Sequence, residues 1–164
     1  MYDVVVVGAG VAGLTATLYA TMYGLKTICV GNEIGGKLTW APGIIDYPGL
    51  PIVSGKDLVA GLYEQVQKMS GHVVQGIVQE VVVENSQFIV TAGVGQYRTS
   101  SIIFATGNPN KQREQIAVPL AQKLGCELRG KLFTVNQWHM TTVSGVFAAG
   151  DCVVYPYGQE QIVS

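Results

Sequence analysis

The sequence predicts an α/β fold in which a central parallel sheet carries an antiparallel meander. Residues 2–7 and 26–30 are short apolar runs rich in β-branched side chains, as in parallel strands that are buried on both faces. Residues 11–23 between them contain no charged side chain and are predicted to form a helix, which completes a βαβ unit. Short strand-like runs separated by turn residues follow between residues 78 and 99, and they predict the meander.

The second helix is predicted from its two ends. Ser54 is a favourable N-cap residue, and Asp57 stands three positions later as in a weak capping box. Leu62 and Met69 belong to a stripe of apolar residues at helical spacing and are expected in the core. Gly71 is predicted to end this helix.

The remaining strands are predicted from short apolar runs. Residues 72–75 precede the meander, and residues 101–105 return to the buried, β-branched type after it. Asn85 and Ser86 are turn residues and are predicted to join the first two meander strands. The strands of the meander are expected at 78–83, 87–91 and 96–99.

Two long stretches carry little predicted structure. Residues 31–54 are rich in Gly and Pro, and a loop of this length is usually functional. Residues 108–130 are predicted to be irregular except for a short helix at 119–124, which would begin at a proline. Strands at 131–135 and 146–149 complete the predicted fold.

The composition indicates one globular domain without a strongly charged surface. The chain has 164 residues, of which 48% are hydrophobic and 13% are charged, so it can bury a sizeable core. Its net charge is −1 and its 10 basic residues form no run, which argues against nucleic acid or an anionic membrane as a partner. Residues 4–25 lack charge, but Gly8 and Gly10 divide them into pieces too short to span a membrane, and no basic segment precedes them. We therefore expect a soluble, cytoplasmic protein.

The three cysteines, Cys29, Cys126 and Cys152, are odd in number and far apart in the sequence. They form no C-x-x-C pair and no Cys/His cluster with zinc spacing, so we expect no metal site. Reduced thiols of a cytoplasmic protein are the simplest interpretation. Cys152 stands apart from the other two because it directly follows Asp151, an acid at the end of the last predicted strand.

A glycine-rich turn joins the first strand to the first helix. Gly8-Ala9-Gly10-Val11-Ala12-Gly13 is a G-x-G-x-x-G sequence in the strand-turn-helix context that a dinucleotide-binding turn requires. Gly8 is expected to permit the tight turn, Gly10 to let the backbone approach a pyrophosphate, and Gly13 to allow close packing of helix and strand. The helix N-terminus would offer free N–H groups to the phosphates. The alternative is a glycine-rich turn that binds no ligand.

Polar residues follow three of the predicted parallel strands. Asn32 and Glu33 follow the second strand, where an acid often binds a ribose hydroxyl, although Glu33 could also be an exposed loop residue. Thr106 follows the strand at 101–105 within the sequence A-T-G. Asp151 follows the last strand within F-A-A-G-D, where a short acid can accept hydrogen bonds from a sugar-alcohol chain or cap a helix.

These motifs, taken in this order, resemble the FAD domain of the pyridine nucleotide-disulfide oxidoreductases. Within that family, residues 35–39 (G-G-K-L-T) and 46–49 (D-Y-P-G) resemble the G-G-Q-L-T and N-x-P-G segments of thioredoxin reductases. The resemblance covers residues 1–107 and 130–164. It implies a single Rossmann-like FAD-binding domain over residues 1–164, of the three-layer ββα type, in which residues 108–129 replace the NAD(P)H-binding domain.

The resemblance also implies which residues contact FAD. The glycines of the turn would hold the pyrophosphate, Glu33 would lie at the adenosine ribose, and Asp151 would hold the ribityl chain. The backbone of Ile77 and Val78 would meet the adenine, and a backbone N–H of Gln161 would point at the flavin ring. The implied cofactor-binding set is Gly8, Gly10, Val11, Ala12, Gly13, Gly31, Asn32, Glu33, Gly35, Gly36, Lys37, Leu38, Asp46, Ile77, Val78, Ala105, Thr106, Gly107, Gly150, Asp151 and Gln161.

Departures from the family limit the implied activity. Only residues 108–144 stand where the family has a whole NAD(P)H-binding domain, and they contain neither a second G-x-G-x-x-G nor a C-x-x-C. The last helix of the family also continues past the position of Ser164. We therefore expect an oxidoreductase-like flavoprotein that receives electrons from an external donor or partner subunit and is not a complete thioredoxin reductase. The alternatives are a non-catalytic FAD-binding module, natural or made by domain deletion, and a Rossmann domain that binds NAD(P).

The same departure predicts how the chain assembles. Without the second domain, the surface that it covers in the family would be exposed, and large apolar patches usually become interfaces. We therefore expect a two-fold homodimer, with Trp40, Pro42, Tyr47 and Leu50 as candidate contacts. The alternative is a monomer in which residues 108–130 fold over the gap.

Overall fold

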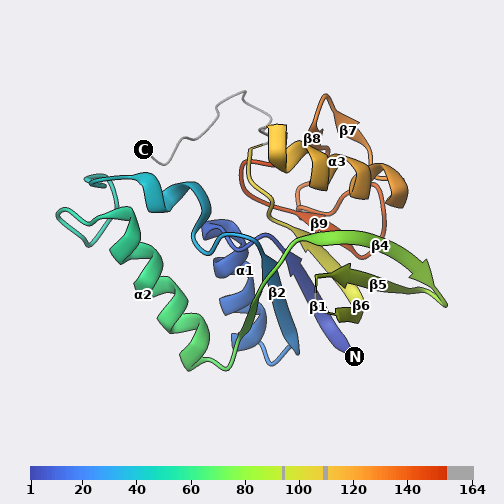
Figure 1. Cartoon of the computed structure of the whole chain (residues 1–164), viewed down its shortest axis with the longest axis horizontal. Coiled ribbons are helices and arrows are strands. Elements are labelled where there is room, and N and C mark those ends of the chain that lie inside the picture. The colour runs from blue at the N-terminus through green and yellow to red at the C-terminus, as the bar shows by residue number, and fades with distance from the viewer. Residues whose placement is uncertain (94, 109–110, 155–164) are drawn as a thin grey trace.

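The structure, a computed structural model, describes residues 1–93, 95–108 and 111–154 (Figure 1). One mixed sheet of seven strands runs through the molecule. Its strands are β1 (Tyr2–Val7), β2 (Thr27–Gly31), β3 (His72–Gln75), β4 (Val78–Glu84), β5 (Gln87–Ala92), β6 (Gly95–Phe104) and β9 (Val146–Ala148). Their order is β3-β2-β1-β6-β5-β4, and β9 also pairs with β6.

The pairing confirms the predicted parallel sheet with an antiparallel meander. β1 pairs in parallel with β2 and with β6, β2 pairs in parallel with β3, and β6 pairs in parallel with β9. β4, β5 and β6 pair in an antiparallel way and form the meander. Asn85 and Ser86 both have positive φ angles, 50° and 62°, as a two-residue hairpin turn requires.

β6 belongs to both parts of the sheet, and the prediction of two separate strands at 96–99 and 101–105 is wrong. Residues 95–99 pair with β5, while residues 102–104 pair with β9. The serines at 100 and 101 interrupt the apolar pattern without interrupting the strand. Ser101 Oγ donates a hydrogen bond of 2.8 Å to the backbone oxygen of Asp3, so the sheet accommodates this polar side chain.

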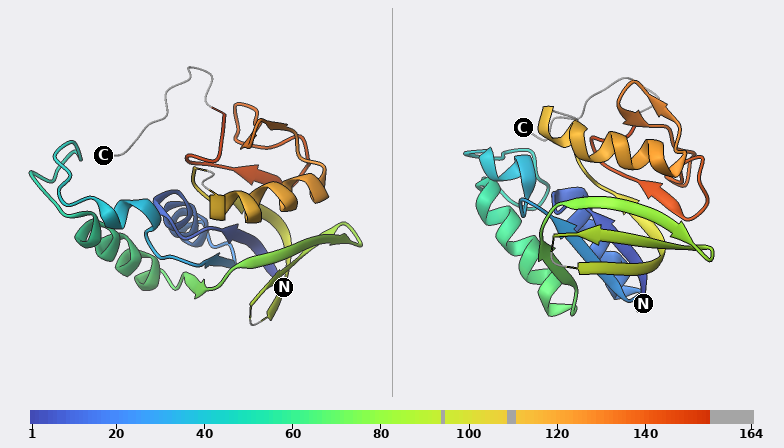
Figure 2. Two further views of the ribbon diagram at one scale, coloured as in Figure 1. Left: turned by 45° about the horizontal axis from the view of Figure 1, so that its top comes forward. Right: turned by 45° about the vertical axis from the view of Figure 1, so that its right-hand side comes forward.

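Helices cover both faces of the parallel sheet (Figure 2). Val4 and Val6 of β1 pack on the side of α1 (Val11–Met22), and α2 (Gly55–Lys68) packs against α1. Val5 and Val7 point to the other face, into the cluster formed with the meander and α3 (Lys111–Leu124). The central strand is therefore buried on both sides, as its unbroken run of valines predicts.

Residues 111–130 contain more regular structure than predicted, because α3 extends over Lys111–Leu124 rather than 119–124 alone. Pro119 lies inside the helix instead of at its start, which costs about 3 kcal/mol in an isolated helix. Ala117, Leu120 and Ala121 are buried against the core, and this packing offsets that cost. The predicted strand at 131–135 is shorter: β7 (Leu128–Arg129) and β8 (Leu132–Phe133) form a two-stranded hairpin.

The ends of α2 confirm one predicted cap and correct the other. Ser54 Oγ accepts a hydrogen bond of 3.1 Å from the backbone N–H of Asp57 and caps the helix as predicted. At the other end the left-handed residue is Ser70, with φ 61°, rather than Gly71. Gly71 is needed because a Cβ there would lie 2.7 Å from the Val66 side chain. Met69 is 42% exposed, so its predicted place in the core is wrong.

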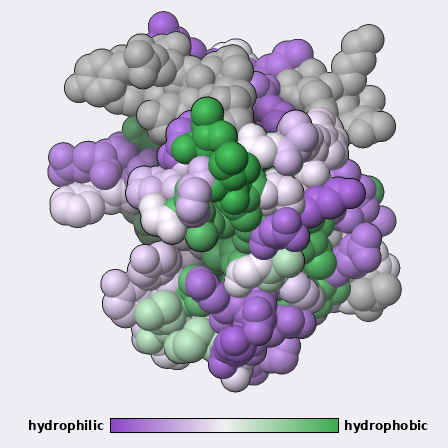
Figure 3. Space-filling view, turned by 90° about the vertical axis from the view of Figure 1, so that its left-hand side faces the viewer, coloured by the Kyte–Doolittle hydropathy of each residue, from purple (hydrophilic) through white to green (hydrophobic). Residues whose placement is uncertain are grey.

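The loop before α2 contains the short helix η1 (Gly36–Trp40) and, after it, a projecting segment whose two ends are hydrogen-bonded to each other. Ile44 and Val53 exchange two backbone hydrogen bonds, of 2.8 and 3.1 Å, and close off residues 45–52. Figure 3 shows apolar side chains gathered on this side of the molecule. The exposed apolar residues of the loop are Trp40, Ile45, Tyr47, Leu50 and Ile52.

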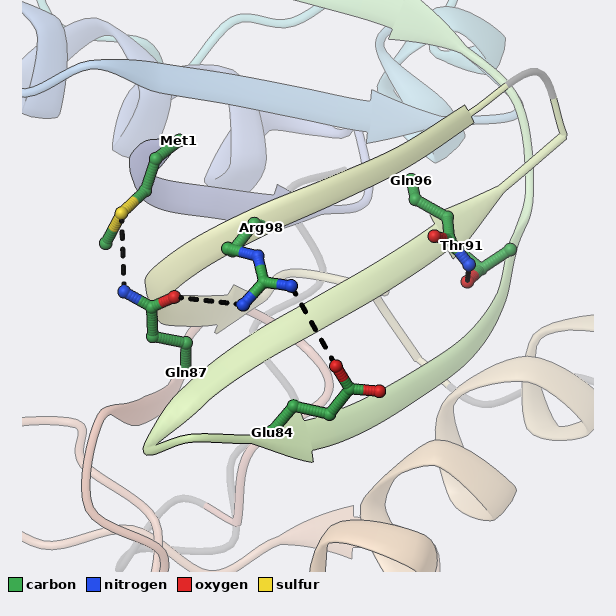
Figure 4. Close-up of polar contacts among 6 residues, drawn as sticks. All are labelled: Met1, Glu84, Gln87, Thr91, Gln96 and Arg98. Carbon is green, nitrogen blue, oxygen red and sulfur yellow. Dashed lines mark hydrogen bonds and ion pairs between the residues drawn. The ribbon is translucent and has the colours of Figure 1, made fainter.

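The outer face of the meander is polar (Figure 4). Arg98 on β6 bonds to Gln87 on β5 and pairs with Glu84 on β4, at 3.3 and 3.8 Å. Gln96 and Thr91 are joined in the same way across β6 and β5. Within the described ranges, no helix is long and apolar enough to cross a lipid bilayer.

Candidate functional site

The glycine-rich turn lies where the strand order reverses. β2 and β3 lie on one side of β1, and β6 and β9 lie on the other. Residues 8–13 follow the carboxyl end of β1 and open α1, so the turn sits at the switch point of the parallel sheet. Ligands of open α/β sheets bind at such points, outside the carboxyl ends of the strands.

Gly8 and Gly13 are fixed by backbone packing. Gly8 has a φ of 109°, and a Cβ there would lie 2.3 Å from the carbonyl oxygen of Ala105. A Cβ at Gly13 would lie 1.8 Å from the carbonyl oxygen of Gly8. Real Cβ atoms do not approach backbone so closely, so both positions require glycine. These contacts join β1, α1 and the end of β6.

Gly10 differs from its two neighbours, because a Cβ there would meet nothing within 4 Å. Its φ of −73° is also open to any residue. The fold itself therefore does not need glycine at this position. Gly10 caps α1 without a side-chain hydrogen bond, and the space that a Cβ would enter in front of it is open. The helix dipole adds positive potential there, which suits an anion.

A second pair of glycines lies against the turn. Gly35 donates a backbone hydrogen bond of 2.7 Å to Ala9 and forms an isolated bridge with Gly10. Gly36 follows it, and a Cβ on Gly36 would lie 3.4 Å from the Cα of Gly10. Lys37 and the buried Leu38 come next in η1. The structure thus brings the segment 35–38 to the turn.

The end of β2 forms one side of the site. Gly31 packs tightly on Ala9, and Asn32 and Glu33 follow it as exposed residues. Gly76 donates a backbone hydrogen bond of 3.0 Å to Gly31, which brings the segment after β3 to the same edge. In that segment Ile77 is 42% exposed and Val78 is buried.

Gln75, the last residue of β3, was not singled out from the sequence. Its side-chain amide donates a hydrogen bond of 3.1 Å to the backbone oxygen of Asn32. Gln75 pairs in register with Gly31, so it stands beside the end of β2. Its place as the last polar residue of a parallel strand is the signal that could have found it.

Thr106 forms part of the opposite side. Ala105 before it is buried against Gly8, and Gly107 after it has a φ of 74°. Thr106 Oγ1 is buried and has no well-formed hydrogen bond to any described residue. Burial raises the pKa of Cys152, and the nearby Thr106 hydroxyl partly opposes that rise. The contact between the Thr106 hydroxyl and the Cys152 thiol does not have the geometry of a hydrogen bond. A buried hydroxyl left in this way fits a site where a ligand supplies the partner.

Asp151 is held in place by its neighbours in the chain. Gly150 packs on α1, where its Cβ would lie 2.8 Å from the Cβ of Ala12. Cys152 Sγ donates to the backbone oxygens of Phe104 and Ala149, at 3.4 and 3.2 Å. In the described part of the chain no helix begins at Asp151, so it is not a helix cap there. Its carboxylate lies 3.7 Å from the ammonium of Lys37.

Asp46 is not brought to the turn by any observed contact, and it lies exposed on the projecting segment 45–52. Gln161 lies outside the described residues. The remaining members of the set follow the carboxyl ends of β1, β2, β3, β6 and β9, or form the loop that packs on the turn.

The cysteines are free and buried. Burial raises the pKa of Cys29 from its ordinary value of 9.0 to about 12, and it also raises the pKa of Cys126 and Cys152. Protonated thiols are poor nucleophiles. Among the residues that the structure describes, His, Cys, Asp and Glu form no group of three that could hold a metal ion.

Comparison with known proteins identifies the class to which this site belongs. Residues 3–92 match the FAD binding domain family, and the chain belongs to that family. Within it, the chain is similar to thioredoxin reductases: it is 31% identical to that of Bacillus subtilis (strain 168) over 126 residues, which is 76% of this chain and 39% of the relative. It is 32% identical to that of Listeria monocytogenes over 113 residues, or 68% of this chain and 35% of the relative. The chain therefore aligns with less than half the length of these relatives.

Solved structures show the same fold. The thioredoxin reductase of Lactococcus lactis superposes with a TM-score of 0.85 at 15% identity, over 99% of this chain and 94% of that chain. A ferredoxin-flavin thioredoxin reductase from Clostridium acetobutylicum superposes with a TM-score of 0.78 at 19% identity, over 95% of this chain and 90% of that chain. The sheet with its meander is thus the fold of a thioredoxin reductase FAD domain.

Proposed function

We propose that this chain binds FAD, with the pyrophosphate at the N-terminus of α1. The observation that carries the proposal is the contrast within the turn. Gly8 and Gly13 are required by backbone contacts, whereas a Cβ at Gly10, where α1 begins, would meet nothing within 4 Å. A glycine that the fold does not need, at the one place where a phosphate would approach the backbone, supports a ligand-binding role.

The polar residues of the site support a ligand that extends to both sides of β1. Glu33 lies on the β2 side of β1, while Thr106 and Asp151 follow β6 and β9 on the other side. A ligand that meets both sets must cross the switch point. FAD does so, with the adenosine ribose at Glu33 and the ribityl chain at Asp151 and Thr106. FMN has a single phosphate and no adenosine to reach Glu33.

We further propose that the chain is the flavin half of an oxidoreductase and takes its electrons from an external donor or partner subunit. When bound, FAD would supply the hydride and electron chemistry. The chain's own residues would hold and orient the cofactor, and residues 108–129 would stand in place of a second nucleotide-binding domain. Its three cysteines are free and buried, so they support no internal dithiol relay.

An absorption titration tests the cofactor assignment. We expect FAD to bind with one-to-one stoichiometry and with a perturbed flavin spectrum, and FMN and NAD⁺ to bind at least about tenfold more weakly. Equal affinity for FAD and FMN would contradict a site that binds the ligand on both sides of β1. Binding of NAD⁺ alone would favour the alternative of a Rossmann domain that binds NAD(P). Mixing the FAD complex with NADH or NADPH in a stopped-flow instrument then separates an electron-transfer role from a binding module.

We also propose that the apolar loop before α2 mediates a homodimer. Trp40, Tyr47 and Leu50 are 64%, 46% and 40% exposed, and exposed apolar patches favour interfaces. Light scattering of the FAD complex at micromolar concentration tests this proposal. We expect twice the chain mass of 17.5 kDa, whereas a mass near 17.5 kDa would contradict it.

A further inference from the structure

The ion pair between Lys37 and Asp151 connects the two segments that flank the first turn of α1. Lys37 follows Gly36, which lies against Gly10. Asp151 follows Gly150, which packs on Ala12 one residue into the helix. Lys37 and Asp151 therefore belong to segments that pack at the N-terminus of α1, where the proposed pyrophosphate would bind.

Lys37 is also the one basic residue in the segments that form the site. Residues 8–13, 31–38, 105–108 and 148–154 contain no other Lys or Arg. The next basic residue in this part of the chain, Lys26, lies at the amino end of β2, with its ammonium 5.2 Å from the ring centre of Tyr2. A pyrophosphate brings two negative charges, so Lys37 is placed to neutralise one of them.

The ion pair between Lys37 and Asp151 is weak enough for the Lys37 ammonium to leave Asp151 and bind another anion. Its N–O distance is 3.7 Å, and each side chain is 42% exposed. Such solvent-exposed pairs contribute roughly 0–1 kcal/mol. The pyrophosphate as a whole carries two negative charges and a carboxylate carries one, so the pyrophosphate attracts an ammonium more strongly. The ammonium carries a single positive charge, and the Asp151 carboxylate already neutralises part of it, so Asp151 and a phosphate compete for Lys37.

We infer that Lys37 is the cation that recognises the pyrophosphate of the bound dinucleotide, and that Asp151 competes for it. This inference rests on the proposed function, since it places the phosphates at the N-terminus of α1. Asp151 then has two opposite effects. It favours the ribityl chain by accepting hydrogen bonds, and it disfavours the phosphates by holding Lys37 and by adding negative charge.

Equilibrium binding of ADP and FAD to purified variants tests the inference. ADP carries the two phosphates and the adenosine but has no ribityl chain, so it reports on Lys37 without the favourable effect of Asp151. We expect Lys37→Gln to weaken both ligands about tenfold at low ionic strength, with the difference shrinking at high salt. Lys37→Arg should restore most of the affinity. Asp151→Asn should tighten ADP severalfold while it weakens FAD.

Lys26→Gln is the matched control, because it removes the same charge at the opposite end of the sheet. We expect it to leave both affinities within about twofold, and thermal melting should show that every variant is folded. If Lys37→Gln binds ADP like the wild type, or loses no more than Lys26→Gln, the inference is overturned. It is also overturned if Asp151→Asn weakens ADP as much as Lys37→Gln does, since the pair would then be merely structural.

The wild-type protein distinguishes this failure from that of the proposed function. If it binds ADP but not FAD, the flavin assignment fails, and the Lys37 variants still decide the phosphate contact. If it binds FAD and the Lys37 variants bind equally well, only the role of Lys37 fails. If it binds neither ligand, both proposals are overturned.

Discussion

The turn after β1 and the segment after β9 form two neighbouring walls of the candidate site, but they are positioned by different means. In the turn, Gly8 and Gly13 are locked by contacts between backbone atoms of neighbouring elements. In the segment after β9, Asp151 is positioned through its chain neighbours Gly150 and Cys152, which contact residues far away in the sequence. Phe133 donates a backbone hydrogen bond of 2.8 Å to Cys152, and Cys152 reaches back to Phe104.

This difference explains which amino-acid substitutions each of the two walls tolerates. At Gly8 and Gly13 the backbone contacts leave no room for a single added carbon, so these two positions are nearly fixed. A wall built from side-chain packing depends on volume and can adapt to a changed residue. The first kind can be recognised from a short motif, while the second depends on the whole fold.

The largest effect is expected for Gly13→Ala. The added Cβ would lie 1.8 Å from the carbonyl oxygen of Gly8, and a backbone atom cannot move away without separating β1 from α1. We expect a loss of at least about 3 kcal/mol in the free energy of unfolding. Urea denaturation checks this loss.

Gly61→Ala is the matched control for that variant. A Cβ at Gly61, inside α2, meets nothing within 4 Å. Alanine should therefore stabilise the protein by about 0.5–1 kcal/mol. A Gly13→Ala protein as stable as the wild type would contradict the steric account of the turn.

Phe133→Ala tests the packing of the second wall, the segment after β9. Phe133 is 1% exposed and stacks on Phe104, with 4.8 Å between ring centres. Its truncation should cost about 3–5 kcal/mol. Hydrogen exchange should also speed up at residues 152–154, which pair with the backbone of Phe133. Trp138→Ala, at a site that is 73% exposed, should change stability by no more than about 0.5 kcal/mol. Similar losses for the two variants would mean that Phe133 does not anchor this wall.

Thr106→Val separates stability from binding at one residue. The variant keeps the shape of the side chain and removes a buried hydroxyl that has no well-formed hydrogen bond in the described structure. We expect the ligand-free protein to gain about 1 kcal/mol and the affinity for FAD to fall about fivefold. Thermal melting and flavin titration measure the two quantities. A variant that is destabilised and binds FAD normally would show that the hydroxyl serves the fold.

The smallest effect concerns the reactivity of the thiols. Burial raises the pKa of Cys29 to about 12, so its thiolate is scarce at pH 8. Alkylation of the native protein at pH 8 should therefore be much slower than alkylation in urea. Because the protonated thiol is favoured in the folded state, its contribution to stability is complete below pH 9 and is lost as the pH rises toward 12. Rapid alkylation of a cysteine in the native protein would contradict this prediction and would support a redox role for the thiols.

The elements that the sequence predicts well are those defined by local pattern. The valines of β1, the glycines at 8, 10 and 13 and the cap at Ser54 depend on neighbours within a few residues, and the structure confirms the elements that they predict. α3 was largely missed because Pro119 normally starts or breaks a helix. Here the burial of Leu120 and Ala121 outweighs that preference, and only the tertiary structure reveals it.

The site shows the same limit. The G-x-G-x-x-G motif predicts a phosphate-binding turn, but no pattern predicts that Lys37 lies beside Asp151, because they come from distant parts of the chain. The sequence likewise treats its three motif glycines alike. The structure separates them into two that the fold requires and one that it does not.

The most direct test of the account is FAD binding by Gly10→Val. The side chain would point into open space, so the fold should survive with a loss of about 1 kcal/mol from the poorer helix cap. The same side chain would occupy the place where the pyrophosphate meets the backbone. We predict a folded protein with a melting temperature within about 5 °C of the wild type and an affinity for FAD at least about 100-fold weaker. A folded Gly10→Val protein that binds one equivalent of FAD with wild-type affinity would contradict the account.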